Sequence, residues 1–255
     1  MDSKRDDARQ FYLQTEYFSF WEQRLRSGYE EPHLLEFIRN LNLRKTDLVL
    51  EIGSGGGRIL ARISPIVLRC VGVDVSKNAL KAGTFATCLP HNVDLVVAEA
   101  SALPFMTSCF DKSFSFSTMF FVPDQVAAIR ESNRVSLQST VEVENRLSFE
   151  GLISILQELG MTAFGFVRRA TGPRFATELA TLTLGRSRAE RLVKYQETGL
   201  VHKSFPVWVW TLTNRLRRKN VKIVAIGGVQ RRVPWWLSSK VIISSQKNST
   251  GELKG

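Results

Sequence analysis

The chain has 255 residues, 44% of them hydrophobic, which excludes a disordered chain and fits one large globular domain or a domain with a cap. Its three cysteines (Cys70, Cys88 and Cys109) are odd in number and lack Cys-x-x-Cys spacing, which argues against a disulfide framework and against a zinc knuckle. The net charge is +11, and residues 201–255 contribute +10 of it, with eleven basic residues and one acid.

The N-terminal region has the composition of helices that pack against a larger domain. Its first residues are charged and lack an apolar core, so we expect no secretory signal. No apolar run in the chain approaches the roughly 18 residues of a membrane span. Residues 6–27 carry an apolar stripe at helical spacing, formed by Phe11, Phe18, Trp21 and Leu25. A second helix is expected after Pro32, because proline suits the first turn of a helix.

A glycine-rich loop follows a short apolar run. Residues 48–50 predict a buried parallel strand that ends in Glu51, and three glycines follow at spacing two: Gly53, Gly55 and Gly57. Glycine permits positive φ and close approach of a ligand, and the next helix offers its free N–H groups. Arg58 stands where a dinucleotide fingerprint needs glycine, and a phosphate-binding loop would need a lysine that is absent. We expect a nucleotide-like ligand with an amino group and a positive charge; a glycine-rich turn in another α/β protein is the alternative.

Two further strands are expected to end in acids. Residues 69–74 end in Asp74, which lies 21 residues after Gly53, near the distance at which Rossmann-like folds place a ribose-binding acid. Ser76 is a plausible N-cap of the helix that follows. Residues 93–98 form a third predicted strand, which Glu99 follows directly. Three successive strands that each end in an acidic residue indicate a site for a nucleotide-like ligand much more specifically than any one of them does.

These motifs resemble the class I S-adenosylmethionine (SAM) dependent methyltransferases over about residues 45–145. The resemblance rests on the E-x-G-x-G-x-G loop, the acid at Asp74, the Leu-Pro-Phe triplet at 103–105 and the Phe-Asp pair at 110–111. It implies an α/β, Rossmann-like, seven-stranded sheet with helices on both faces and a helical cap insertion. It also implies that SAM is the cofactor and S-adenosylhomocysteine the product, with no metal. The cofactor-binding residues it implies are Glu51, Gly53, Ser54, Gly55, Gly57, Asp74, Val75, Glu99, Ala100 and Ser117.

Within that resemblance, Asp74 would accept hydrogen bonds from the ribose hydroxyls and Glu99 from the adenine amino group, with the backbone of Ala100 close by. The chain departs from the family pattern in three places. Ala98-Glu99 replaces a more usual Gly-Asp pair, Phe120 and Phe121 stand where histidines often occur, and residues 136–140 replace a Leu-Lys-Pro-Gly-Gly turn. We expect strands at 112–117 and 137–144 and a helix at 125–135 around these departures.

The resemblance also implies four regions. Residues 1–44 would form an N-terminal helical lid and residues 45–148 the SAM-binding core. Residues 149–203 would be a helical cap for substrate, with helices at 152–160 and 175–195. Residues 204–255 would add a helix and an antiparallel β-hairpin whose strands begin near Val221 and Lys240.

Methyl transfer requires the nucleophile and the methyl group to be aligned and water to be excluded, so no conspicuous catalytic residue is needed. The chain lacks the Pro-Pro motif of amino methylation after the fourth strand, a Pro-Cys nucleophile and a paired-glutamate loop. The histidines at 33, 91 and 202 follow no metal-ligand pattern. Candidates for a general base are His202, Tyr195 and Asp124, each of which has a structural or solvated role as its alternative.

No motif identifies the methyl acceptor, so its class has to be inferred from the aromatic and charged residues of the chain. The C-terminal region interleaves four tryptophans with arginines: Trp208, Trp210, Trp235, Trp236, Arg215, Arg217, Arg218, Arg231 and Arg232. Three interpretations of this region remain open: a solvated face, a surface that binds anionic membrane lipid, or a surface that binds RNA phosphates. The cap insertion also resembles the small-molecule and lipid branch of the family, which includes quinone and sterol methyltransferases. We therefore favour a small, hydrophobic or lipid-like acceptor methylated on O, C or N, in a cytoplasmic protein with possible peripheral membrane contact. An RNA methyltransferase and a non-catalytic SAM-binding protein are the alternatives, and the oligomeric state is not predicted.

Overall fold

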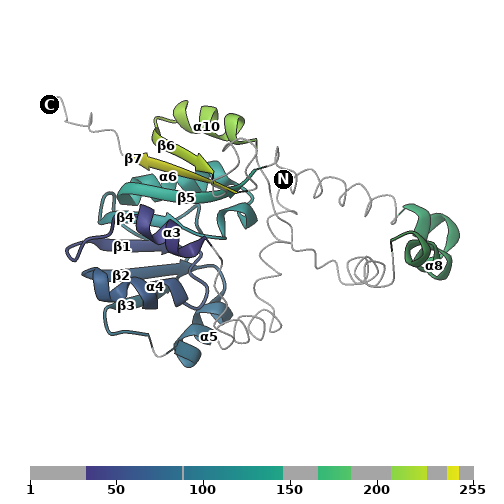
Figure 1. Cartoon of the computed structure of the whole chain (residues 1–255), viewed down its shortest axis with the longest axis horizontal. Coiled ribbons are helices and arrows are strands. Elements are labelled where there is room, and N and C mark those ends of the chain that lie inside the picture. The colour runs from purple at the N-terminus through teal and green to yellow at the C-terminus, as the bar shows by residue number, and fades with distance from the viewer. Residues whose placement is uncertain (1–32, 88, 146–165, 185–207, 229–239, 247–255) are drawn as a thin grey trace.

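The computed structural model describes residues 33–87, 89–145, 166–184, 208–228 and 240–246. Its strands form one seven-stranded sheet in the order β3-β2-β1-β4-β5-β7-β6. The strands are β1 (Leu48–Ile52), β2 (Arg69–Asp74), β3 (Val93–Val97), β4 (Phe110–Ser115), β5 (Ser136–Glu144), β6 (Lys222–Gly228) and β7 (Lys240–Gln246). The first five strands pair in parallel, and β7 pairs antiparallel with both β5 and β6. The predicted Rossmann-like fold class and terminal hairpin are confirmed (Figure 1).

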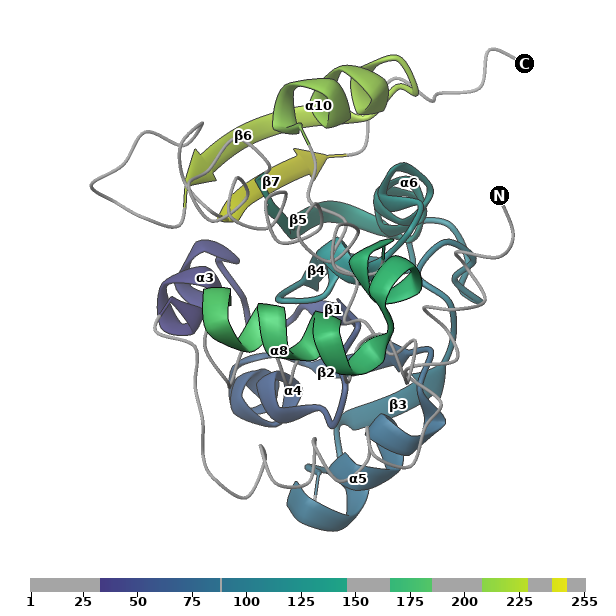
Figure 2. The ribbon, with the colours of Figure 1, turned by 90° about the vertical axis from the view of Figure 1, so that its right-hand side faces the viewer.

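Helices cover both faces of this sheet (Figure 2). The described helices are α3 (Leu34–Asn40), α4 (Arg58–Ile63), α5 (Lys77–Thr87), α6 (Gln125–Val135), α8 (Pro173–Leu184) and α10 (Val209–Arg217), with short 3-10 turns η1 (Ser64–Ile66) and η2 (Met119–Phe121). A further helical stretch spans 166–171. The predicted helices at 6–27 and 152–160 lie outside the described residues, as does the second half of the one predicted at 175–195.

The two faces of the sheet are packed separately. On one face, α3 and α4 pack on β1 and β4 through Phe37, Leu60, Val49 and Phe114. On the other face, α6 and α10 pack on β5 and β7 through residues that include Ile129, Val141, Leu216 and Ile243. Burying side chains of this size contributes roughly 1.5–3 kcal/mol each.

Lysine 112 fixes the end of α3 to the sheet. Its Nζ atom donates to the carbonyl oxygens of Leu41 (2.7 Å) and Asn42 and forms an ion pair with Asp47 (3.5 Å). Charge-assisted hydrogen bonds of this kind are stronger than neutral ones. The position of α3 over β4 is therefore set at its C-terminal end by Lys112 and in its middle by Phe37, which packs against Phe114.

Serines take the place of the missing glycine turn before β5. Helix α6 passes directly into β5 at Ser136, without an intervening loop. The hydroxyl of Ser113 lies 2.7 Å from that of Ser132 and 2.6 Å from that of Ser136, and Ser132 in turn lies 2.7 Å from Ser139. All four side chains are buried. This hydrogen-bonded cluster allows a polar junction to be buried at the base of β4 and β5.

The strand directions define two edges of the sheet. The parallel strands end at the edge that holds the glycine loop, here called the carboxyl edge, and begin at the amino edge. Strand β6 runs parallel to β5, so it begins at the amino edge. Helix α10 ends five residues before β6, so it runs from the carboxyl edge to the amino edge. Figure 1 shows α8 set apart from the sheet, beyond the carboxyl edge. Among the described residues, no helix has the length and apolarity needed to cross a bilayer.

Candidate cofactor and active site

The glycine loop leaves β1 and turns back onto the end of β2. The backbone N–H groups of Gly53 and Ser54 both donate to the carbonyl oxygen of Val73, at 2.8 and 3.0 Å. All three glycines have positive φ: 77° at Gly53, 53° at Gly55 and 74° at Gly57. Such angles are disfavoured for residues with a Cβ atom. The loop then enters α4, whose N-cap is Gly57.

Thr118, which follows β4, holds the loop from the other side. Its hydroxyl donates to the carbonyl oxygen of Gly53 (3.0 Å), and a Cβ atom built on Gly53 would lie only 2.0 Å from Cγ2 of Thr118. No motif in the sequence singles out Thr118, because the contact joins residues 65 positions apart. Gly53 is therefore required by its backbone angle and by its neighbour.

Asp74 lies at the end of β2 and is bonded to the glycine loop. Its Oδ2 atom accepts from the N–H of Gly55 (2.9 Å) and its Oδ1 atom from the N–H of Ser76 (2.8 Å). Burial raises the pKa of Asp74 above its ordinary value, while hydrogen bonds from the backbone of Ser76, Gly55 and Val75 act to lower it. Each carboxylate oxygen can accept more than one hydrogen bond, so this group can also accept from a pair of ligand hydroxyls.

Two buried polar side chains lie near the start of the loop. Glu51, on β1, is only 1% exposed. The hydroxyl of Ser54 is buried and has no hydrogen-bond partner among the described residues. Cys70, on β2, is also buried; burial and the charge of Glu51 raise its pKa to about 12, so this thiol is no nucleophile. An acid and an unsatisfied hydroxyl fit a ligand that carries an amino group.

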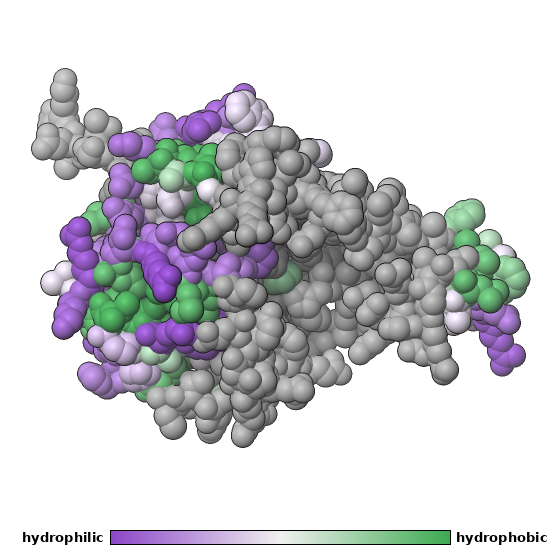
Figure 3. Space-filling view, viewed as in Figure 1, coloured by the Kyte–Doolittle hydropathy of each residue, from purple (hydrophilic) through white to green (hydrophobic). Residues whose placement is uncertain are grey.

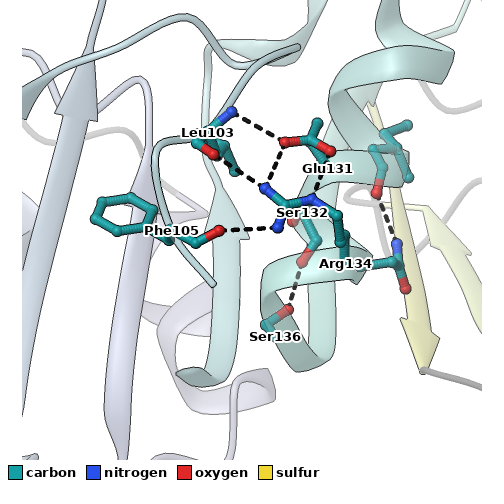
Figure 4. Close-up of polar contacts among 8 residues, drawn as sticks. Leu103, Phe105, Glu131, Ser132, Arg134 and Ser136 are labelled. Carbon is teal, nitrogen blue, oxygen red and sulfur yellow. Dashed lines mark hydrogen bonds and ion pairs between the residues drawn. The ribbon is translucent and has the colours of Figure 1, made fainter. Parts of the chain in front are cut away.

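The segment after β3 is held in place by α6 (Figure 4). Arg134 donates to the carbonyl oxygens of Leu103 (2.9 Å) and Phe105 (2.8 Å), and Glu131 accepts from the N–H of Leu103 (3.0 Å). Glu131 and Arg134 also pair with each other at 2.7 Å, and this hydrogen bond holds the pKa of Glu131 below its ordinary value. The sequence pattern did not indicate either residue.

The predicted site residues gather at the carboxyl edge. Glu51, the loop residues 53–57, Asp74 and Val75 lie on β1, β2 and the turns that follow them. Glu99 is exposed and pairs through its backbone with Ala102, while Ala100 packs partly into the core. Ser117 follows β4 with φ of 51°, and its hydroxyl accepts from Nζ of Lys240 (3.2 Å).

The three candidates for a general base have different outcomes. Asp124 is the N-cap of α6 and accepts from the N–H of Ala127 (3.0 Å), which gives its carboxylate a structural role. Tyr195 and His202 lie outside the described residues. Across the described part of the chain, no three His, Cys, Asp or Glu side chains are grouped so as to hold a metal ion.

Comparisons with known proteins agree with this geometry. Residues 50–138 match the family model described as methyltransferase domain. The demethylmenaquinone methyltransferase of Staphylococcus aureus is 30% identical over 146 residues, which cover 54% of this chain and 58% of that protein. The chain thus spans less than two thirds of the length of the curated relatives that it matches.

Solved structures show the same fold at low identity. A chain of the complex between the Haloferax volcanii Trm112 methyltransferase activator and a methyltransferase aligns with a TM-score of 0.61 at 11% identity, covering 90% of this chain and 95% of that chain. A SAM-dependent methyltransferase from Mesorhizobium loti aligns with a TM-score of 0.55 at 14% identity, covering 87% and 99%. Residues 50–138 thus match a methyltransferase domain, and the chain shares the fold of known SAM-dependent methyltransferases.

Proposed function

We propose that this protein is an enzyme that transfers the methyl group of SAM to a small, hydrophobic, quinol-like acceptor at the carboxyl edge of the sheet. The observation that carries the proposal is the arrangement of Asp74 and the glycine loop, in which one carboxylate is bonded to the loop and can still accept from two hydroxyls. The relative from Staphylococcus aureus, whose name gives demethylmenaquinone as its acceptor, supports the quinol class.

The described residues fit SAM in several ways. Asp74 would hold the ribose, the buried acid Glu51 and the hydroxyl of Ser54 would face the amino-acid part, and Glu99 with the backbone of Ala100 would lie by the adenine. Ser117, after β4, would lie near the sulfur. When bound, SAM supplies an electrophilic methyl group. The protein's own contribution is to hold the acceptor in line with that methyl group and to exclude water.

Apolar side chains at the carboxyl edge support a lipid-like acceptor. Trp208 and Trp210 lie at the start of α10, at this edge, and are 47% and 68% exposed. Beyond the edge, α8 exposes three large apolar side chains at helical spacing, namely Phe175, Leu179 and Leu182. Figure 3 shows this apolar surface on α8. Tryptophan favours the membrane interface, so these residues support peripheral contact with a lipid surface.

The arginines that the structure describes in the C-terminal region lie elsewhere, while Arg231, Arg232, Trp235 and Trp236 lie outside the described residues. Arg215, Arg217, Arg218, Lys219 and Lys222 are exposed where α10 ends and β6 begins, which is the amino edge. Any RNA or anionic lipid that bound this cluster would be held at the opposite edge from the glycine loop. This cluster is therefore a weak argument for an RNA acceptor at the site.

The test uses methyl-tritiated SAM and the purified protein. One reaction contains chemically reduced demethylmenaquinone; a second contains cell extract, which is then separated into lipid, RNA, protein and small-molecule fractions. Label in the quinol or in the lipid fraction supports the proposal, and the Asp74→Asn variant should lose it. Label in RNA alone would overturn it in favour of an RNA methyltransferase. No label in any fraction, with SAM binding demonstrated by calorimetry, would favour a non-catalytic SAM-binding protein.

A further inference from the structure

Four polar side chains meet at the carboxyl edge, and of these only Ser117 belongs to a site that the motifs predict. Glu142, on β5, is fully buried. Its Oε2 atom lies 3.3 Å from Nε2 of His33, and its Oε1 atom lies 2.8 Å from Nζ of Lys240. The same Nζ donates to the hydroxyl of Ser117 (3.2 Å). The cluster joins residues from the start of α3, from β5, from β7 and from the turn after β4.

The imidazole of His33 is held over the end of β4. Its ring centroid lies 5.0 Å from that of Phe116, which also packs against Phe37 at 4.9 Å. Phe116 is two residues before Thr118, which contacts the glycine loop at Gly53. The side chain of His33 is 18% exposed. The ring is thus linked to the glycine loop through Phe116 and Thr118, and part of its surface stays accessible.

The charges in the cluster determine which ring nitrogen carries the proton. A buried carboxylate is costly unless it is paired, and Lys240 supplies the charge that neutralises Glu142. An ionised carboxylate can only accept hydrogen bonds, so Nε2 of His33 must donate to it. In the neutral imidazole the other nitrogen, Nδ1, is then an acceptor, which no described residue occupies.

We propose that His33 is the general base of methyl transfer, with Glu142 and Lys240 as positioning residues. This inference rests on the proposed function and names the class of acceptor further, as one that carries a hydroxyl group. As in other catalytic pairs, the carboxylate fixes the ring's orientation and tautomer while the free nitrogen takes a proton. Sequence reasoning missed this role because residues 33 and 142 are 109 positions apart.

Methyl transfer to a hydroxyl-bearing acceptor releases one proton. The hydroxyl proton of the acceptor passes to Nδ1 of His33, and the acceptor atom forms a bond to the methyl carbon. The bond between sulfur and that carbon breaks, and its electron pair goes to sulfur, giving S-adenosylhomocysteine. Where a carbon of the acceptor's ring is the nucleophile, that carbon then loses its hydrogen as a proton, and the acceptor oxygen takes a proton back to restore the hydroxyl group. Either way one proton is released, and His33 passes it to solvent.

The first test compares His33→Gln with His91→Gln, since His91 is an exposed histidine at the turn before β3. We expect His33→Gln to lower kcat by about 100-fold or more, which is the usual contribution of a general base, and His91→Gln to leave it unchanged. The dissociation constant of SAM should stay within about twofold in both. Added imidazole should restore activity to His33→Ala but not to Asp74→Asn. Equal turnover of the two glutamine variants would overturn the inference.

A second test does not depend on activity. Nitrogen-15 NMR of the histidine rings should show the proton of His33 on Nε2, and Glu142→Gln should abolish that preference while leaving His91 unchanged. If the proton is on Nδ1, or if Glu142→Gln changes nothing, the inference is wrong even where the enzyme is active. If no acceptor is methylated but the NMR result holds, the proposed function fails while the assigned tautomer stands.

Discussion

Gly53 is constrained twice, by its own backbone and by the side chain that faces it. Its φ of 77° is one that residues with a Cβ atom adopt at a cost of roughly 1–2 kcal/mol. In addition, Thr118 occupies the space into which a Cβ would point. A substitution would therefore displace the turn that carries the N–H groups of Gly53 and Ser54, and these groups tie the loop to β2.

We expect Gly53→Ala to weaken SAM binding by at least about tenfold, which corresponds to about 1.4 kcal/mol. Isothermal titration calorimetry would measure it. Gly227→Ala is the matched control, because a Cβ on Gly227 meets nothing within 4 Å and its backbone angle is ordinary. The double variant with Thr118→Gly should recover only part of the affinity, since it relieves the clash and not the backbone strain. If Gly53→Ala bound SAM with wild-type affinity, the glycine loop would not be part of the cofactor site.

Asp74 gives a prediction about pH. Because burial raises its pKa, the folded protein holds this proton more tightly than the unfolded chain does. The resulting stability is present at low pH and is lost as pH rises from the ordinary aspartate value through the raised pKa. Asp74→Asn cannot ionise, so urea unfolding at a series of pH values should show that this loss is absent in the variant. An unchanged pH dependence would show that Asp74 titrates normally in the folded state.

At the scale of elements, helix α6 supports the loop between β3 and β4. The strands, the glycine loop and the acid at Asp74 could be predicted because their signals lie in neighbouring residues. The bonds from Glu131 and Arg134 to the loop at 103–105 could not, because they join segments about thirty positions apart in the chain. Thr118 and His33 escaped prediction for the same physical reason. The serines before β5 form a hydrogen-bonded junction that their spacing did not indicate.

Arg134→Met should lower the free energy of unfolding by about 1–3 kcal/mol, because the carbonyl oxygens of Leu103 and Phe105 lose their donors. We also expect weaker SAM binding, since the loop follows Glu99 and Ala100. Arg130→Met, an exposed arginine one turn earlier on α6, is the control and should change little.

The Arg134→Met variant also tests the lowered pKa of Glu131. A lowered carboxyl pKa contributes stability at neutral pH, and this contribution is lost as pH falls through the lowered value. The difference in unfolding free energy between the wild type and Arg134→Met should therefore shrink at acid pH. A difference that stays constant with pH would mean that the ion pair adds nothing to stability.

At the scale of the whole molecule, the aromatic and basic residues of helix α10 are separated. The sequence places Trp208 and Trp210 within ten residues of Arg215 and Arg217, and a single surface was a reasonable expectation. Helix α10 runs from the carboxyl edge to the amino edge, so it carries the tryptophans to one edge and the arginines to the other. Helix α8, which carries exposed apolar residues, lies beyond the carboxyl edge (Figure 1).

For the proposed lipid contact, this separation predicts that α8, and not the amino edge, carries the residues that bind the lipid surface. The change Phe175→Asp/Leu182→Asp should weaken sedimentation with vesicles by about tenfold or more, because each large side chain contributes roughly 1.5–3 kcal/mol when fully buried in lipid. Both side chains are exposed, so folding should be unaffected. Ile66→Asp/Leu68→Asp makes the same change at exposed positions of the amino edge and should leave binding unaltered. If the control variant lost binding and the α8 variant kept it, the amino edge would be the docking face, and the lipid would lie on the far side of the sheet from Asp74.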